Sequence, residues 1–463
     1  MVVFLAYWYP LKNRINAQNV LILVSSYLFY GWWDYRFLSL IIISSVLDYN
    51  LGIAIHNTRD EKWRKGLLYI SLLGNLGILG YFKYYNFFVE SFVNSFESIG
   101  INLNSTTLNV VLPVGISFYT FQTLSYTIDV YRDKLKPTKN WITFFAYVCF
   151  FPQLVAGPIE RAKNLIPQFE KNRVFELEKA KDGMRQILIG LIKKVVIADN
   201  CALAVNAIFS DPQSYNSPTL VLGTILFAFQ IYGDFSGYSD IAIGSARLLG
   251  FDLMKNFNFP YFAKDIADFW RRWHISLSTW FRDYLYIPLG GSRVESKGLL
   301  FRNVMVIFIV SGFWHGANWT FIFWGFLHAL FFLPLIFLGL NRKNIATSEK
   351  TRLLPSFKEL IQMGITFSLV CFAWIFFRVD SISDGFYYVK EMVMWEGVRP
   401  LYLSTLLYVI FFLVIEWVQK DKEHSLDIRH LPRPVRWATY YTAIFILFYF
   451  MPDSSPDFIY FQF

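Results

Sequence analysis

The sequence predicts an all-α integral membrane protein, a polytopic helical bundle with about nine to twelve membrane segments. Two observations support this prediction. Hydrophobic residues make up 55% of the 463 residues and charged residues only 17%, whereas soluble domains carry roughly 25% charged residues. The apolar residues also gather in long runs, and a run of about 20 is enough to cross a bilayer.

The apolar segments fall at residues 20–33, 37–55, 67–82, 108–128, 141–156, 185–209, 219–233, 300–314, 317–340, 360–378, 401–418 and 436–451. Glycine and proline interrupt them at Pro113–Gly115, Gly157–Pro158 and Gly233–Gly237. Unpaired backbone at membrane depth needs shielding by protein or a wet cavity. We therefore expect broken or re-entrant helices around a central chamber or tunnel. With no internal repeat and no long linker, residues 1–463 are predicted to form a single transmembrane domain.

The formal charge of +9 comes from short basic clusters between the apolar runs. This distribution is typical of cytoplasmic loops and of contact with anionic lipid headgroups in the bilayer. A nucleic-acid-binding protein would show a continuous basic face or arm, so we expect no nucleic-acid partner. The cysteines Cys149, Cys201 and Cys371 lie in three different apolar stretches. We interpret them as small buried residues, not as disulfides or zinc ligands.

Residues 264–284 differ from the spanning segments, because apolar and polar side chains alternate there with helical spacing. One face holds Trp270, Trp273 and Trp280, while arginines occupy the opposite face. His274 falls on the border between the two faces. The pattern predicts an interfacial or re-entrant helix that does not cross the membrane.

From residue 303 to residue 341 the chain has no Asp, Glu, Lys or Arg. As one helix this segment would be about 58 Å long, and a bilayer crossing needs only about 30 Å. We expect it to cross, break near Trp314–Asn318 with Gly312 and Gly316 at the break, and return.

His315 and His328 are the only side chains in this segment that titrate near neutral pH. A histidine inside a membrane is a functional candidate, although a neutral ring bonded to a backbone carbonyl or to Asn318 is the plainer interpretation. Histidine suits acyl transfer because it takes a proton from a hydroxyl and returns it to a leaving group at neutral pH. No GxSxG elbow is present. Direct transfer is favoured over a serine acyl-enzyme, and a covalent step on histidine stays open.

A metal site is the competing use of these side chains. His274, His315 and His328 with Asp234 or Asp240 offer suitable ligand types. However, neither HExxH nor another paired ligand spacing occurs in the sequence. We therefore predict no metal.

Five stretches resemble the membrane-bound O-acyltransferase family, in the branch that contains the membrane subunit of alginate O-acetyltransferase. They are LPVGISFYT at 112–120, PQLVAGPIER at 152–161, IYGDFSGYSD at 231–240, FWRRWHISLSTWFRDYLYIPLGG at 269–291 and GFWHGANW at 312–319. They follow the order of the family over residues 20–380.

The resemblance implies that His315 is catalytic and that His274 is the second histidine of the chamber. Trp314 and Asn318, beside His315, are expected to contact substrate. The resemblance also implies a multi-pass protein of the cytoplasmic (inner) membrane. An acyl-coenzyme A, with acetyl-coenzyme A as the expected donor substrate and no bound cofactor, would enter from the cytoplasm. The acetyl group would leave for a cell-surface polysaccharide, directly or through a periplasmic acetyltransferase partner.

The remaining motif residues have two interpretations each. Asp234 and Asp240 would position a hydroxyl or orient a histidine, or else satisfy Arg271, Arg272 or helix-end amides, and we favour this structural role for both. Arg161 and Arg282 would hold coenzyme A phosphates, because arginine matches phosphate geometry, or contact lipid headgroups. Gly233 replaces the bulky aromatic residue usual in the family, and we expect it to loosen the local helix or the chamber wall, so that the role of Asp234 in the family does not carry over directly.

Two non-enzymatic functions compete with the acyltransferase. A transporter or flippase for a lipid-linked sugar also needs a polar chamber with broken helices, and a scaffold for a periplasmic transferase needs neither histidine. Thioester cleavage would distinguish the enzyme from the carrier, whereas the scaffold predicts that both histidines can be replaced without loss of product.

Overall fold

A computed structural model describes residues 1–103, 107–108, 111–340, 354–394, 397, 401–452, 456 and 458–459. Within these ranges the chain forms helices and connections without a strand, which confirms the all-α prediction. Its contacts group into two compact units, residues 1–183 with 245–254, and residues 184–244 with 255–463. The boundary falls inside two helices, α8 (Leu177–Leu191) and α10 (Ser217–Leu248). The single-domain organisation stays a prediction, and each unit is described separately.

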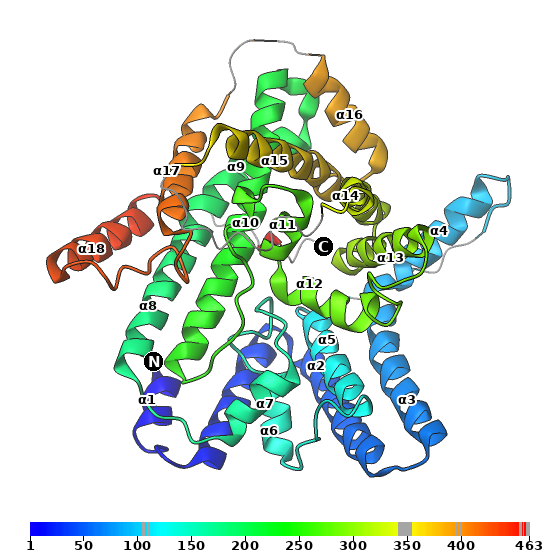
Figure 1. Ribbon diagram of the computed structural model, residues 1–463, viewed down its shortest axis with the longest axis vertical. Coiled ribbons are helices and arrows are strands. Elements are labelled where there is room, and N and C mark those ends of the chain that lie inside the picture. Colours follow the sequence, from blue (N-terminus) through cyan, green and yellow to red (C-terminus); the bar gives the residue numbers. More distant parts are fainter. Residues whose placement is uncertain are drawn as a thin grey trace. The chain divides into compact units, whose positions relative to one another are not determined.

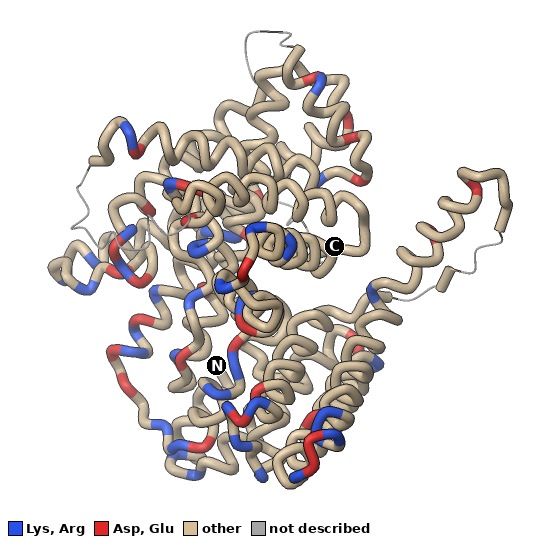
Figure 2. The backbone as a smooth tube through the Cα atoms, turned by 45° about the vertical axis from the view of Figure 1, so that its right-hand side comes forward, with Lys and Arg blue, Asp and Glu red and all other residues tan. Residues whose placement is uncertain are grey.

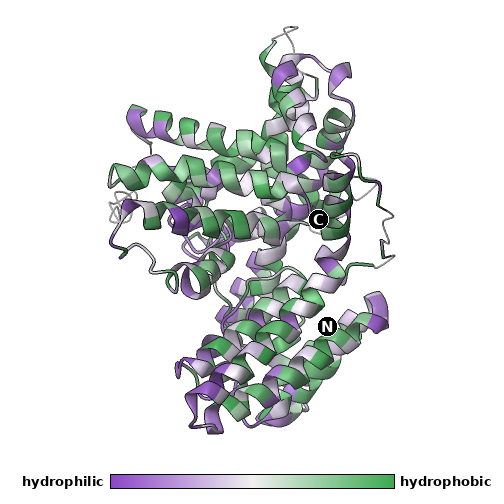
Figure 3. Ribbon diagram, turned by 90° about the vertical axis from the view of Figure 1, so that its right-hand side faces the viewer, coloured by the Kyte–Doolittle hydropathy of each residue, from purple (hydrophilic) through white to green (hydrophobic). Residues whose placement is uncertain are grey.

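Six of the described helices are long and apolar enough to cross a membrane: Ile15–Asn57, Glu61–Glu97, Ser217–Leu248, Lys297–His315, Trp319–Phe337 and Phe357–Arg378. A shorter apolar helix covers Leu403–Gln419. Figure 3 shows these helices as mainly hydrophobic, with hydrophilic residues concentrated at ends and connections. In Figure 2 the charged residues cluster likewise between long uncharged stretches. The protein is a multi-pass membrane protein. Fewer helices meet the spanning criterion than the nine to twelve segments expected, because segments such as 141–156 and 185–209 form shorter or interrupted helices.

The first unit contains the N-terminal helices, coloured blue to cyan in Figure 1. They are α1 (Val2–Trp8), α2 (Ile15–Asn57), α3 (Glu61–Leu79), a π-helix (Gly80–Tyr84), α4 (Tyr85–Glu97), α5 (Ile116–Tyr131), α6 (Trp141–Val148) and α7 (Ala162–Glu170). The 43-residue α2 bends at Asp34, whose backbone is non-helical, and it packs against α3, α5 and α6. Many of its apolar side chains are exposed, among them Leu28 and Trp32, as expected for helices that face lipid.

The second unit carries the remaining helices. They are a π-helix (Ile192–Ala198), α9 (Asp199–Ser210), most of α10, α11 (Ile266–Arg272), α12 (Ile275–Phe281), a π-helix (Arg282–Tyr286), α13 (Lys297–His315), α14 (Trp319–Phe337), α15 (Phe357–Arg378), α16 (Ile382–Val393), α17 (Leu403–Gln419) and α18 (Arg433–Tyr449). Two 3₁₀ turns, Pro212–Ser214 and Pro260–Phe262, connect them. Helix α14 packs against both α13 and α15.

Two of the three predicted interruptions are present. Helix α5 begins directly after Gly115, and residues 149–161 form turns between α6 and α7. The interruption expected at Gly233–Gly237 is wrong, because both glycines lie inside the continuous α10. A Cβ at Gly233 would stand 2.8 Å from the carbonyl oxygen of Lys193. Gly233 therefore permits close packing of two backbones and does not loosen the helix.

The single helix predicted at 264–284 is also wrong. Two seven-residue helices, α11 and α12, are separated at Trp273 and His274, and the π-helix Arg282–Tyr286 follows. His274 has φ of 42° and ψ of 54°, the left-handed conformation that ends a helix. Each piece is too short to cross a bilayer, so the absence of a spanning helix here agrees with the prediction.

The break predicted in the histidine segment is confirmed. Helix α13 ends at His315 and α14 begins at Trp319, with extended backbone at Gly316 and Asn318 between them. Gly312 is not at the break as expected, but inside α13. There a Cβ would stand 2.1 Å from the carbonyl oxygen of Phe321 on α14. Gly312 thus belongs to the contact between the two arms of the hairpin.

Candidate active site

His315 is the last residue of α13, and its side chain is buried, with 6% of its surface exposed. Three aromatic rings surround the imidazole. The ring centroids of Trp314, Trp324 and Phe377 lie 5.0, 5.2 and 5.3 Å from its own. Because the C-terminal turn of a helix ends in carbonyls without an intrahelical partner, the ring stands at the polar end of α13.

His274 is buried at the break between α11 and α12. Its Nδ1 lies 3.1 Å from Oδ1 of Asn256, and its Nε2 is buried with no hydrogen-bonding partner among the described residues. Burial disfavours the charged imidazolium and lowers the pKa of His274 from 6.5 to about 3. The ring is therefore neutral at physiological pH.

The structure brings the two predicted histidines together. Their ring centroids are 6.4 Å apart, and Trp314 contacts both rings, 6.0 Å from His274 and 5.0 Å from His315. The motif at 231–240 contributes Phe235, whose ring meets the edge of His274 at 4.6 Å. The two imidazoles thus share one aromatic enclosure, built by α10, α12 and the α13–α14 hairpin.

His328, the third histidine considered from the sequence, has a different environment. Trp270 donates a hydrogen bond from Nε1 to its Nδ1 at 3.3 Å. The ring of Phe269 lies almost parallel to it at 6.2 Å, and that of Trp324 meets it at 4.8 Å. We interpret His328 as a neutral ring that holds α14 against α11.

Asp234 pairs with a lysine and not with the arginines considered from the sequence. Its Oδ1 lies 2.8 Å from Nζ of Lys194, which also lies 2.8 Å from Oδ1 of Asp199. Its Oδ2 accepts a hydrogen bond from the backbone N–H of Ile459 at 2.7 Å. These contacts favour the structural interpretation of Asp234.

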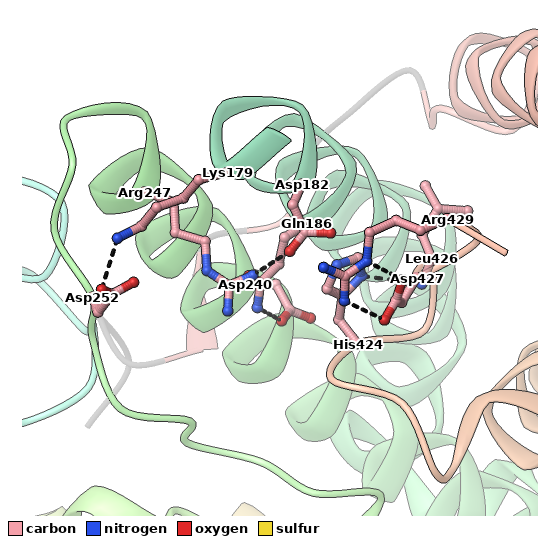
Figure 4. Close-up of polar contacts among 10 residues, drawn as sticks. All are labelled: Lys179, Asp182, Gln186, Asp240, Arg247, Asp252, His424, Leu426, Asp427 and Arg429. Atoms are coloured by element: carbon pink, nitrogen blue, oxygen red, sulfur yellow. Dashed lines mark hydrogen bonds and ion pairs between the residues drawn. The ribbon is translucent and has the colours of Figure 1, made fainter. Parts of the chain in front are cut away.

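Asp240 belongs to a second buried ion cluster. Nζ of Lys193 lies 3.0 Å from Oδ2 of Asp240 and 3.4 Å from Oε1 of Glu416. Tyr232 donates its hydroxyl to Glu416 at 2.7 Å, and Gln186 donates to Oδ1 of Asp240 at 2.9 Å, as Figure 4 shows. Sequence reasoning overlooked Lys193 and Glu416. Both are charged side chains inside the predicted apolar segments 185–209 and 401–418, where a charge indicates a functional or paired group.

A small polar cavity adjoins this cluster. Its lining includes Lys193, Ser239, Asp240, Lys255 and Asn256. Asn256 therefore stands between the cavity and the imidazole of His274. Sequence reasoning missed this residue too, because Asn256 lies in an irregular connection with no periodicity to mark it.

Beside the cavity, the segment after α17 is held by its own polar contacts. The backbone N–H of Leu426 donates to Nδ1 of His424 at 3.2 Å, and Arg429 holds Asp427 with two bonds of 2.8 Å (Figure 4). This charged hydrogen bonding outweighs partial burial and lowers the pKa of Asp427 to about 2. His424 itself lines the cavity, so these contacts fix part of its wall.

The other predicted binding residues are placed as follows. Asn318 caps α14, accepting from the backbone N–H of Thr320 at 3.0 Å, and donates to the backbone carbonyl of Asp380 at 2.9 Å. Arg282 is exposed and pairs with Asp283 at 2.8 Å. Arg161 is buried in the first unit. Contact of these residues with substrate stays a prediction, as does the chamber open to both sides of the membrane.

A metal site would need several ligand side chains close together within the part of the chain that the structure describes. In it, no group of three or more His, Cys, Asp or Glu side chains is placed to hold a metal ion. Asp234 and Asp240, the carboxylates considered as ligands, instead pair with lysines.

Comparison with known proteins adds independent observations. Residues 132–376 match the model of the membrane-bound O-acyltransferase family. A probable alginate O-acetylase of Pseudomonas syringae pv. tomato is 41% identical over 382 residues, covering 82% of this chain and 70% of the relative. A peptidoglycan O-acetyltransferase of Helicobacter pylori is 36% identical over 420 residues, covering 85% and 77%. A teichoic acid D-alanyltransferase of Bacillus subtilis is 28% identical over 285 residues, covering 58% and 69%.

Proposed function

Because this chain belongs to the membrane-bound O-acyltransferase family, we propose that it transfers an acetyl group from acetyl-coenzyme A to a hydroxyl outside the cytoplasmic membrane. The observation that supports this most directly is the pair of buried imidazoles, His274 and His315, with ring centroids 6.4 Å apart. Relatives named for O-acetylation of alginate and of peptidoglycan support acetyl as the group transferred.

In the proposed reaction, His315 is the general base. It takes the proton of the acceptor hydroxyl while the oxygen attacks the thioester carbonyl, so that a C–O bond forms and the C–S bond breaks. The proton then passes from the imidazolium to the departing thiolate, giving free coenzyme A. A general base of this kind accelerates such a step by roughly 10²–10⁴-fold. His274 stays neutral and orients the reacting groups.

The proposed acceptor is a hydroxyl of a cell-envelope polysaccharide, reached directly or through a serine of a periplasmic acetyltransferase. The named relatives act on polymers of different chemistry, alginate, peptidoglycan and teichoic acid. What these polymers share is a location outside the cytoplasmic membrane. This supports passage of the acetyl group across the bilayer and not a particular sugar.

The test uses purified protein in lipid nanodiscs with radiolabelled acetyl-coenzyme A and an envelope polysaccharide fraction. We expect free coenzyme A to appear together with labelled polymer. His315→Ala should reduce both at least 100-fold, while His430→Ala, an exposed histidine, should leave both unchanged. Thermal unfolding of each variant checks its fold. A folded His315→Ala protein with the wild-type rate would overturn the role of His315, and transport of sugar without release of coenzyme A would favour a carrier.

A further inference from the structure

Asn256 is completely buried in the connection after α10, and every polar group of its side chain has a partner. Oδ1 accepts from the backbone N–H of Ser276 at 3.3 Å and from the Ser276 hydroxyl at 2.9 Å. It also lies 3.1 Å from Nδ1 of His274. Nδ2 donates to the hydroxyl oxygen of Ser239 at 3.1 Å. The backbone carbonyl accepts from the N–H of Ile275 at 2.8 Å.

These contacts determine which tautomer His274 adopts. A backbone N–H can only donate, so the atom of Asn256 that faces Ser276 must be the amide oxygen. That oxygen cannot donate to His274. The hydrogen bond between them therefore requires a proton on Nδ1, and in a neutral ring this leaves Nε2 as a lone pair.

The nitrogen that keeps the lone pair, Nε2, is also the one without a hydrogen-bonding partner in the described part of the chain. Nε2 of His274 is buried without a hydrogen bond among the described residues, within the ring cluster of Phe235, Trp314 and His315. A buried acceptor left unpaired destabilises the fold unless a ligand or a water completes it. The same holds for Nε2 of His328, so what distinguishes His274 is the ring of His315 beside it.

We propose that Asn256 is a positioning residue for acyl transfer, which holds His274 as the Nδ1–H tautomer so that its Nε2 accepts a hydrogen bond from the acceptor hydroxyl or from His315. This inference rests on the proposed function. Asn256 acts through His274 and touches neither substrate. The same residue also supports the left-handed backbone of His274, because its carbonyl and amide hold the next two residues of α12.

An amide is better suited to this task than a carboxylate. Both accept from Nδ1–H, but a carboxylate would add a negative charge beside the ring and favour the imidazolium. The imidazolium has no lone pair at Nε2. A neutral acceptor therefore fixes the tautomer and keeps the ring able to accept a hydrogen bond.

The first arm of the test needs no substrate. Histidine is labelled with ¹⁵N in the full chain, and solid-state NMR in bilayers reads the protonation of each ring nitrogen. The signal of His274 is the one missing from His274→Gln. We expect a protonated Nδ1 and an unprotonated Nε2 at pH 7, and a substantial Nε2–H population in Asn256→Leu. A wild-type Nε2–H ring, or a tautomer unchanged in Asn256→Leu, would overturn the proposal.

The second arm measures acetyl transfer. Asn256→Leu should lower kcat by about 10- to 100-fold and change KM for acetyl-coenzyme A less than about threefold. Asn256→Asp, nearly the same shape, should keep the tautomer but raise by about one unit or more the pH at which the ¹⁵N signals of His274 become those of the imidazolium. The matched control Ser276→Ala removes a bond to the same oxygen without touching His274, and should lose less than about threefold.

The outcomes separate the two hypotheses. If Asn256→Leu changes the tautomer as expected but transfers acetyl at the wild-type rate, the positioning role is wrong and acyl transfer stands. An unmoved ¹⁵N titration of His274 in folded Asn256→Asp would also refute it. If wild-type protein with the expected tautomer transfers no acetyl group, the proposed function fails, and the positioning role for acyl transfer fails with it.

Discussion

The substitution Gly312→Ala tests how the hairpin places His315. The added Cβ would stand 2.1 Å from the backbone oxygen of Phe321 and 3.4 Å from Cα of Gly325. A backbone oxygen cannot rotate away as a side chain can. To reach an ordinary contact, α13 and α14 must therefore separate by about 1 Å.

Overpacking of this kind costs about 1–3 kcal/mol, and alanine regains only about 0.5–1 kcal/mol through its helix propensity. The net loss is then up to about 2.5 kcal/mol, and we expect Tm to fall by about 1–2.5 °C, because a chain of this size loses roughly 1 °C per kcal/mol. His315 lies one turn after Gly312 on the same helix, so it moves with α13. A shift of 1 Å in a reacting group can lower kcat about 100-fold.

The assay compares Gly312→Ala with Gly364→Ala, because a Cβ at Gly364 in α15 meets nothing within 4 Å. Tm in detergent and acetyl transfer in nanodiscs are measured for both variants. Gly364→Ala should keep wild-type activity and Tm. The reasoning is refuted if the two variants behave alike.

Three further predictions concern charge, pH and capping. Lys193→Met leaves the buried Asp240 and Glu416 without their lysine. In chemical unfolding this should lower the free energy of unfolding by about 3–5 kcal/mol, whereas the exposed Lys181→Met should lower it by under about 0.5 kcal/mol. Equal losses would contradict this. Burial lowers the pKa of His274 to about 3 in the folded state, against 6.5 for the exposed side chain of the unfolded protein. As the pH falls, the unfolded chain therefore binds the proton first. The contribution of neutral His274 to the free energy of unfolding is therefore complete above pH 6.5. Below pH 6.5 it falls by at most about 1.4 kcal/mol per pH unit, and a Tm–pH curve for His274→Gln should lack this fall. Asn318→Ala removes the cap of α14 and should lower Tm through a loss of about 1 kcal/mol, measured by thermal unfolding; an unchanged Tm would show that the cap is dispensable.

The sequence predicted the helical membrane fold and the hairpin break, because both follow from local rules. A charge-free segment longer than one bilayer crossing must turn back, and Gly316 and Asn318 mark the position of that turn. Interruptions were harder to predict. Gly233 in α10 has the appearance of a helix breaker, yet it serves packing against a backbone distant in sequence.

The candidate site was predicted in part for the same reason. His274 and His315 carry recognisable neighbours, but their partners are long-range. Asn256 lies 18 residues before His274 in the chain, and Glu416 meets Lys193 from a different helix. The helix predicted through His274 failed because its local periodicity cannot reveal that Asn256 supports a left-handed residue. A charge inside an apolar segment, shared by Lys193 with its neighbour Lys194 and carried by Glu416 alone, is the signal that would have found both residues.

The two histidines have unequal surroundings, which assigns them different parts in the proposed reaction. His315 stands at the C-terminal end of the 19-residue α13, where helix carbonyls and the macrodipole favour a cation. His274 lies in a buried break, where desolvation disfavours one. In the proposed reaction the proton of the acceptor hydroxyl therefore passes to His315, while His274 keeps its lone pair as a hydrogen-bond acceptor. Two groups in such different surroundings can divide the acid–base work between them.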